Sequence, residues 1–348
     1  MTVRFYKQGD EAGIKQLHLD VFKKEMSSKL WEWKYLDKPG QQNPFILVFE
    51  EAGVIKGHIA LWVSEAYIEG KEAKIALRVD TMVHPDVRGK GIYTKLNQAM
   101  LQQARAAGVQ LLYGFPSEQA KPPLIGKTDA IDVGGISRYM KIGNPFNVLS
   151  VLFKGIGFVL KPFGRFQAHY RKRVKMPALP EDWAFEEVTH FDPRFNKLAE
   201  EVSDIKSVIL KRDANYLNWR FFKHPNHTYK VFALSNKDRL LGYAVINIEE
   251  KDFDYGRLAI GQLVDCLAVN DNSVWQYLID HTLHQLRETD IVQTWQFPDQ
   301  LPAIKLRKAR FREKDRPMNL VIHILNGHDD SYMNSTDWWI SQVDVDSF

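Results

Sequence analysis

The chain has little cysteine and no long apolar run, and each absence excludes a class of protein. Cys266 is its single cysteine, so no disulfide can form within the chain, and we expect a reducing compartment. No apolar run approaches the ~18 residues that span a bilayer, and the first residues lack the apolar core of a signal peptide. With 45% hydrophobic and 26% charged residues, the composition is typical of a globular protein, which we expect in the cytoplasm.

Metal-ligand patterns are also missing from the sequence. The 11 histidines are scattered along the chain. His281 and His284 could share one face of a helix, but neither a cysteine nor a third histidine completes a site. We therefore expect no metal cofactor.

Acidic residues are absent from residues 143–180, which hold seven Lys and Arg residues but no Asp or Glu. One interpretation is an apolar connector helix packed between two domains. The other is an amphipathic surface over 146–175 that contacts an anionic membrane. A nucleic-acid site would interleave basic and aromatic residues, and this segment is too apolar for that, so we expect no nucleic-acid partner.

The most informative segment follows a strand-like run over residues 75–83. The run ends in a His-Pro pair, a loop with two glycines comes next, and a periodic apolar pattern predicts a helix from Ile92. Glycine lets backbone N–H groups approach a ligand closely, and a helix N-terminus adds free amides and partial positive charge. Because Arg88 and Lys90 add full charges, the loop predicts a phosphate or pyrophosphate site.

Two common phosphate-binding loops do not fit this segment. A Walker loop needs Lys and then Ser or Thr after its second glycine, whereas Gly91 is followed by Ile92 and Tyr93. A dinucleotide fingerprint needs a third glycine where Thr94 stands. The string Val-His-Pro-Asp-Val-Arg-Gly-Lys-Gly-Ile closely resembles the CoA-binding motif of the GNAT superfamily of N-acyltransferases, although a small residue is usual at the position of Tyr93.

The resemblance implies that two parallel strands, at about 75–83 and 109–115, splay apart to admit acyl-CoA. Backbone groups of the first strand would pair with the pantetheine arm, and the loop amides would hold the pyrophosphate. The residues assigned to the cofactor in this way are Met82, Val83, Arg88, Gly89, Lys90, Gly91, Ile92, Tyr93 and Thr94.

The chain also resembles itself at a nearly constant offset. The string Trp-Glu-Trp-Lys-Tyr-Leu at 31–36 is similar to Leu-Asn-Trp-Arg-Phe-Phe at 217–222. Asp80 corresponds to Asp265, and the glycine loop corresponds to residues 270–273, which hold an Asp but neither glycine nor a basic residue. Since such a segment repels a pyrophosphate, we expect the second copy to be non-catalytic.

These patterns predict an α/β (α+β) fold with two tandem GNAT-like units, each a mixed, mostly antiparallel sheet with flanking helices. We expect a catalytic CoA-binding unit over 1–142, a connector over 143–180, a degenerate unit over 181–328 and a tail over 329–348. In the first unit, strands are expected at about 45–50, 54–64, 73–83 and 109–115, and the helix from Ile92 should end at Gly108.

The resemblance implies an acyl-CoA-dependent N-acyltransferase, in the first instance an acetyltransferase, whose acceptor is a small-molecule or sugar amine. The amine attacks the thioester directly, which requires a base for the ammonium proton and an acid for the leaving thiolate. Asp80 is the candidate base, and the alternative is that it only satisfies backbone donors. The usual tyrosine acid has no counterpart in residues 117–128, which leaves Tyr139, Tyr93 or solvent.

Two other functions stay open. One is a tRNA-dependent aminoacyl transferase of the peptidoglycan cross-bridge type, which also pairs two GNAT-like units but generally lacks a CoA loop. The other is a non-enzymatic module that binds acyl-CoA.

The C-terminal tail is aromatic and carries Asp344 and Asp346, which would point to the same face of a strand. One interpretation is a final strand packed on the second unit with its acids in solvent. The other is a tail that crosses to the first unit and places carboxylates in the acceptor pocket. Tandem GNAT-like acetyltransferases of the aminoglycoside-modifying type resemble this in using a C-terminal carboxylate, which makes Phe348 a further catalytic candidate.

Overall fold

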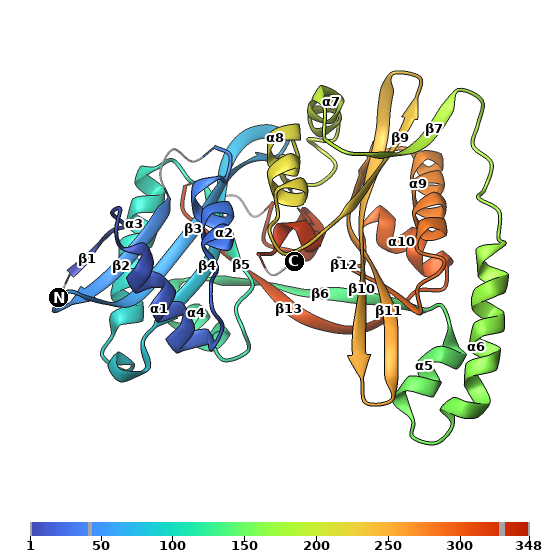
Figure 1. Cartoon of the computed structure of the whole chain (residues 1–348). Coiled ribbons are helices and arrows are strands. Elements are labelled where there is room, and N and C mark those ends of the chain that lie inside the picture. The colour runs from blue at the N-terminus through green and yellow to red at the C-terminus, as the bar shows by residue number, and fades with distance from the viewer. Residues whose placement is uncertain (1, 41–43, 327–330, 347–348) are drawn as a thin grey trace.

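The computed structural model describes residues 2–40, 44–326 and 331–346, which form one continuous sheet with helices on both faces (Figure 1). The first unit comprises β1 (Thr2–Phe5), α1 (Glu11–Phe22), α2 (Ser28–Trp31), η1 (Glu32–Leu36), β2 (Phe45–Glu51), β3 (Val54–Ile68), β4 (Lys71–Val83), η2 (Pro85–Val87), α3 (Ile92–Ala106), β5 (Leu111–Gly114), α4 (Lys121–Thr128) and β6 (Ile131–Ile142). The connector comprises α5 (Pro145–Leu152) and α6 (Gly157–Lys172).

The second unit repeats the order of the first. It comprises β7 (Trp183–Val188), α7 (Pro193–Glu201), β8 (Val208–Leu210), α8 (Ala214–Leu217), η3 (Asn218–Phe222), β9 (Lys230–Asn236), β10 (Arg239–Phe253), β11 (Gly256–Ala268), α9 (Asn272–Gln285), β12 (Ile291–Gln296), α10 (Leu301–Lys308) and β13 (Arg312–Ile324). The tail adds η4 (Ser335–Asp337), β14 (Trp338–Trp339) and η5 (Gln342–Asp344).

The last strand of each unit is exchanged with the other unit. The sheet order is β1-β2-β3-β4-β5-β13-β6-β12-β11-β10-β9-β7. Strand β13 of the second unit therefore pairs with β5 of the first unit. Strand β6 of the first unit pairs with β12 of the second unit. The two exchanged strands also pair with each other, antiparallel, in the middle of the sheet. The domain boundaries expected from the sequence therefore separate segments of the chain, but one sheet contains strands from both units.

Helices α1 and α3 lie on opposite faces of the first unit's strands. The expected register of α3 is confirmed, because Ile92, Leu96, Met100 and Ala104 are all buried against one face of the sheet. Gly108 has φ +76°, and the Val109 N–H donates to the Ala104 carbonyl at 3.0 Å, which closes the helix as predicted. Ile14 and Leu17 of α1 are buried on the other face.

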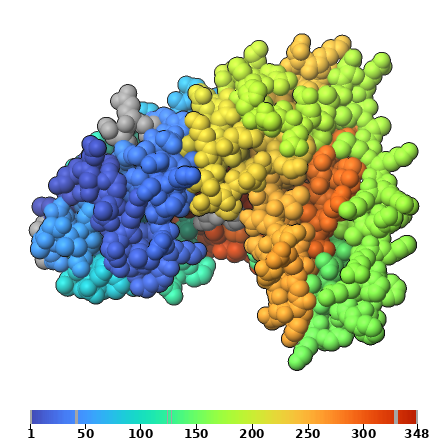
Figure 2. Space-filling model, viewed as in Figure 1, coloured from blue at the N-terminus to red at the C-terminus, as the bar shows by residue number. Residues whose placement is uncertain are grey.

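A pair of tryptophans joins the two units. Trp33 of η1 and Trp219 of η3 stack with ring centroids 5.0 Å apart and ring planes at 14°. Each indole Nε1 donates to the other residue's backbone carbonyl, at 2.9 Å from Trp33 and 2.8 Å from Trp219. This reciprocity is the signature of a two-fold contact between like surfaces. Figure 2 shows the units meeting at the segment with α8 and η3 (yellow), above a hollow between the first unit and the β10–β11 hairpin.

The connector does not lie between the units. Figure 1 places α5 and α6 on the outer edge of the second unit, and the buried Val148 and Val151 of α5 pack against Leu258 and Ile260 of β11. The interpretation as a helix packed between two domains is therefore wrong, because the exchanged strands and the tryptophan pair already fill that interface.

We expect Trp33→Ala and Trp219→Ala each to lower the free energy of unfolding by about 3–5 kcal/mol, since each removes a buried ring and a buried hydrogen bond. Chemical denaturation should show that the double variant loses about 0.5–3 kcal/mol less than the two single losses combined, because the rings contact each other. Phe22→Ala, at an exposed position in α1, is the control. Strictly additive losses would contradict the coupling.

Candidate functional site

The glycine loop has the backbone that the sequence predicts. Gly89 and Gly91 have φ of +80° and +72°, and a Cβ added at either position would meet nothing within 4 Å. Their conformation, and not crowding, is therefore what favours glycine. Gly91 is the N-cap of α3 and gives the helix no side-chain cap. Because a helix leaves its first amides without intrahelical partners, the end of α3 is open to an anion beside the exposed Arg88 and Lys90.

The parallel strands β4 and β5 diverge next to this loop. They pair at three register positions, residues 75–77 with 111–113. Beyond these pairs β4 continues to Val83 and stays paired with β3, whereas β5 ends at Gly114. On that side, the edge of β4 over 78–83 therefore has no strand partner within the described parts of the chain, and we call this divergence of β4 from β5 the opening. Met82 and Val83 lie at the loop end of this opening.

Asp80 lies in a β-bulge on the same stretch of β4. The β3–β4 register passes from His58 opposite Met82 to Ala60 opposite Val79, which inserts one extra residue in β4. Asp80 has φ +46°, and its carboxylate accepts hydrogen bonds from the Tyr35 hydroxyl and, at 2.7 Å, from Lys34 Nζ.

The electrostatics of this cluster hold Asp80 ionised. Burial opposes the charge, but the Lys34 ammonium and the hydrogen bonds from Lys34 and Tyr35 outweigh it and lower the pKa of Asp80. Burial and the same carboxylate raise the pKa of Tyr35 well above its usual value. A carboxylate with a lowered pKa takes up a proton poorly, so in this arrangement Asp80 anchors its neighbours more readily than it acts as a base.

His58 completes the cluster on the buried side. Its Nδ1 lies 2.6 Å from the backbone oxygen of Asp80 and so carries the proton, while Nε2 has no hydrogen-bond partner among the described residues. Complete burial lowers the pKa of His58 from its usual 6.5 to about 4. At neutral pH the ring is therefore uncharged and keeps a free lone pair beside Asp80.

A second polar cluster lies at the opening, next to α3. Arg78 of β4 donates to Asn97 Oδ1 of α3 at 2.6 Å, and its Nη2 lies 3.2 Å from His323 Nδ1. His323, on the exchanged strand β13, places Nε2 2.8 Å from the Thr128 hydroxyl of α4. Tyr93 packs nearby against Leu124, Ala130 and Val321. The opening is thus bordered by residues from both units.

Comparison with known proteins identifies the first unit. Residues 2–126 match the family model described as "Acetyltransferase (GNAT) domain". Because the match covers most of the first unit, the first unit is called the GNAT unit.

The fold of the whole chain agrees with that assignment. It is similar to the GCN5-related N-acetyltransferase from Anabaena variabilis ATCC 29413, with a TM-score of 0.68 and 14% identity over 93% of this chain and 73% of that one. The GCN5-related N-acetyltransferase from Kribbella flavida gives a TM-score of 0.61 and 11% identity, over 93% and 70%. At these identities the likeness concerns the fold alone. No curated protein matches the chain.

The second unit lacks the features that open the GNAT unit to an anion. Asp271 replaces the glycine at the N-cap of α9, and its carboxylate accepts from the amides of Ser273 at 2.7 Å and Val274 at 3.0 Å. These bonds lower the pKa of Asp271 and keep a negative charge where a phosphate would bind. Residues 270–273 thus place a carboxylate on the helix amides, whereas the glycine loop leaves the corresponding amides open to an anion.

The C-terminal tail fills the second unit's own strand opening. Strands β11 and β12 also pair at three positions, residues 260–262 with 291–293, and η5 contacts both strands. Gln342 Nε2 donates to Gln262 Oε1 at 3.0 Å, and the Ser341 hydroxyl donates to Asp265 Oδ1 at 2.7 Å. The place equivalent to the GNAT unit's opening is therefore occupied by protein.

The two tail carboxylates separate, contrary to the expected strand with one acidic face. Asp344 lies in η5, is buried, and accepts from Arg212 Nη2 at 2.7 Å. Asp346 lies beyond η5, and its Oδ2 is 3.1 Å from Lys34 Nζ in the GNAT unit. A tail packed on the second unit with its acids in solvent is thus wrong for both residues. Phe348 lies outside the described residues.

Tyr139 is not brought to the opening of the GNAT unit. It lies on β6, opposite Thr294 of β12, and its hydroxyl accepts a 3.4 Å hydrogen bond from Arg307. Tyr139 pairs with Glu313 of β13, whereas Gly114 at the end of β5 pairs with Val321 of the same strand. Eight residues of strand separate Glu313 from Val321, so Tyr139 lies roughly 25 Å from the end of β5. The exchange of β6 is the reason, and the structure does not support Tyr139 as the acid.

Sequence reasoning missed Lys34, Tyr35, His58, Arg78 and His323. Lys34 and Tyr35 sit inside the repeated tryptophan motif, which by itself indicates only a duplication. His323 comes from the exchanged strand β13, and no local pattern in the sequence shows that it lies beside Arg78.

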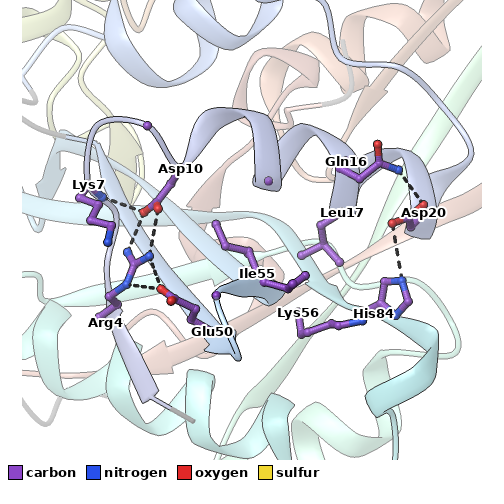
Figure 3. A pocket seen from close by; sticks show the side chains of 14 residues that line it. Arg4, Lys7, Asp10, Gln16, Leu17, Asp20, Glu50, Ile55, Lys56 and His84 are labelled. Carbon is purple, nitrogen blue, oxygen red and sulfur yellow. Dashed lines mark hydrogen bonds and ion pairs between the residues drawn. The ribbon is translucent and has the colours of Figure 1, made fainter.

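A pocket of about 360 Å³ lies beside the start of the loop, on the α1 side (Figure 3). Arg4 binds Asp10 through both terminal nitrogens and also pairs with Glu50. At the other end, His84 Nε2 lies 3.5 Å from Asp20. Asp10 and Glu50 are engaged in ion pairs with Arg4, so this end of the pocket offers paired charges to a ligand. No group of three or more His, Cys, Asp or Glu residues that could hold a metal occurs in the described parts of the chain.

The low pKa of His58 predicts a loss of stability in acid. Between about pH 6.5 and 4 the unfolded chain binds a proton that the folded His58 does not, so the free energy of unfolding falls as the pH drops through this window. Over the whole window, the shifted pKa of His58 changes the free energy of unfolding by about 3 kcal/mol. Denaturation of His58→Asn at pH 7, 5.5 and 4 should show a shallower decline than wild type, with exposed His190→Asn as control. Parallel declines would refute this account.

Proposed function

We propose that the protein is an acyl-CoA-dependent N-acyltransferase that moves an acyl group, in the first instance acetyl, from CoA to a primary amine. The observation that carries the proposal is the uncapped end of α3, with Gly89 and Gly91 in the left-handed conformation, directly beside the diverging strands β4 and β5. Amides and cationic side chains there suit a pyrophosphate. The edge of β4 suits an extended, amide-containing arm.

In the proposed reaction the neutral amine attacks the thioester carbonyl, and the nitrogen loses its proton as the thiolate leaves. No covalent intermediate on the protein is needed. Asp80 and Lys34 form a fixed ion pair at the β4 bulge, and the neutral His58 adds an unshared lone pair beside it. His58, Asp80 and water are the candidates for receiving the amine proton, whereas Lys34 already carries its own proton.

Asp346 is proposed to bind the acceptor. Its side chain is 23% exposed, against 9% for Asp80, so it is the carboxylate of this cluster that reaches solvent. Lys34 neutralises one carboxylate while two surround it, which leaves net negative charge to attract an ammonium group. This charge favours a cationic small-molecule or sugar amine.

The alternatives differ in what they predict for CoA. A tRNA-dependent aminoacyl transferase does not use CoA and would not need the glycine loop. A non-enzymatic module would bind acyl-CoA without releasing thiol. The open end of α3 supports a CoA ligand for this chain, which places the aminoacyl transferase second.

The first test combines calorimetry with thiol release from acetyl-CoA and a panel of amines. Wild type should bind one CoA per chain, since Asp271 and the tail obstruct the second unit. Gly91→Val should weaken binding at least tenfold, because a β-branched residue disfavours φ +72°, and Arg88→Ala should weaken it by severalfold. Gly70→Val, at φ +70° in the turn at the far end of β4, is the matched control.

Each outcome of this test decides between functions. Equal CoA affinity in wild type and both loop variants would overturn the proposal. CoA binding with no thiol release from any amine would favour the binding module. Two CoA molecules per chain would show that the second unit is competent.

The second test concerns Asp346→Asn. Because this residue is partly exposed, the variant should fold and bind CoA as wild type does, while KM for the amine rises about tenfold or more. Deleting residues 344–348 is a poorer test, since Arg220 donates to the Val345 carbonyl at 2.8 Å and Asp344 is buried. An unchanged amine KM in Asp346→Asn would remove the tail from the acceptor site.

A further inference from the structure

The outer face of α6 presents an unbroken apolar stripe to solvent. Val159, Phe163, Phe166 and Tyr170 are spaced by four, three and four residues, which places them on one side of the helix. They are 52%, 55%, 75% and 67% exposed. A surface helix of a globular protein normally buries such a stripe against the core, whereas α6 exposes it to solvent.

Helix α5 extends the same apolar surface. Its inner residues, Val148 and Val151, are buried against β11. Its other apolar side chains are exposed, as are those of the turn that follows and of the start of α6: Phe146, Leu149, Leu152, Phe153, Ile156 and Phe158. Monomeric proteins rarely expose a contiguous apolar patch of this kind without a partner.

The helical pair is held rigidly by polar contacts on its inner side. Asn144 caps α5 by accepting from the Asn147 amide at 3.1 Å, and it donates to the Gly164 carbonyl of α6 at 3.1 Å. Arg171 Nη1 donates to the Thr289 carbonyl at 2.9 Å. The apolar face is therefore presented in a fixed orientation.

The charges that the α5–α6 segment itself carries are of one sign. Residues 143–180 hold seven Lys and Arg residues and no acid. Lys154, Lys161 and Arg165 are exposed, and at 100° per residue Lys161 and Arg165 fall on the same flank of α6. An exposed apolar stripe, on a segment whose own charges are all basic, complements a surface that is apolar below and negatively charged above.

We propose that the α5–α6 surface binds the interface of an anionic lipid bilayer, with α6 lying in the plane of the headgroups. A second copy of this chain fits the surface poorly, because a symmetric contact would bring together two segments that each carry seven basic residues and no acid of their own. None of the described helices is both long and apolar enough to span a bilayer, so the contact is peripheral.

The position of the surface is compatible with activity. Figure 1 places α5 and α6 at the end of the molecule opposite β1 and α3, and Figure 2 shows their residues (green) protruding along that edge. A protein docked there keeps the glycine loop away from the lipid, so acyl-CoA can reach it from solution.

Flotation of the full chain with vesicles tests the proposal. Wild type should float with vesicles of 70% phosphatidylcholine and 30% phosphatidylglycerol, and much less with pure phosphatidylcholine. Phe163→Ser combined with Phe166→Ser should abolish flotation. Lys161→Gln with Arg165→Gln should reduce it about 25-fold, or roughly fivefold per basic residue. Raising the salt to about 0.5 M should also weaken it.

The matched control is Phe5→Ser with Phe22→Ser, which removes two exposed aromatic residues from the first unit and should leave flotation unchanged. Equal flotation of the Phe163/Phe166 variant and wild type would overturn the proposal, as would absence of wild-type binding to anionic vesicles. A dimer that the Phe163/Phe166 variant dissociates, seen by light scattering without vesicle binding, would assign the surface to a second copy instead. None of these readouts depends on CoA.

Discussion

The pairing of β6 with β13 is the contact on which the molecule depends. It places the last strand of each unit in the sheet of the other and so joins two copies of one pattern into a single sheet. The opening beside β5 is bordered by His323 from the far end of the chain, and the tail reaches Lys34 because the units are held together. A GNAT unit without its partner would lack one wall of its site.

The two copies show how a duplicated site is kept in one unit and closed in the other. The same strand–turn–helix corner carries Gly91 in one copy and Asp271 in the other, and the helix amides meet open space in the first and a carboxylate in the second. The strand Asp is present in both. In the second copy Asp265 accepts from Ser341, Tyr243 and Arg212, all inside the protein. Its retention in the closed copy indicates that this Asp supports the bulged strand, whatever role Asp80 has in catalysis.

The local features were predictable from sequence, and the long-range ones were not. The glycine loop, the register of α3 and its end at Gly108 depend on residues within a few positions of one another, so composition and spacing specify them. The sequence does not show which strand pairs with the second edge of β5, because the candidate strands β6 and β13 have the same alternating pattern. Tyr139 was therefore placed with the first unit although it lies in the second. The partners of Asp80 were missed for a related reason, because Lys34 and Tyr35 lie 45 or more residues away in a motif that also packs.

The exchanged strand also sets the order in which the chain can be completed. Gly114 of β5 pairs with Val321 of β13, about 200 residues later. At a synthesis rate of about 5–20 residues per second, β5 waits roughly 10–40 s for its neighbour. During that time it is an unpaired strand edge of the kind that promotes aggregation. The second unit thus supplies the strand that covers this edge, and until β13 has been synthesised the β5 edge is open to pairing with other chains.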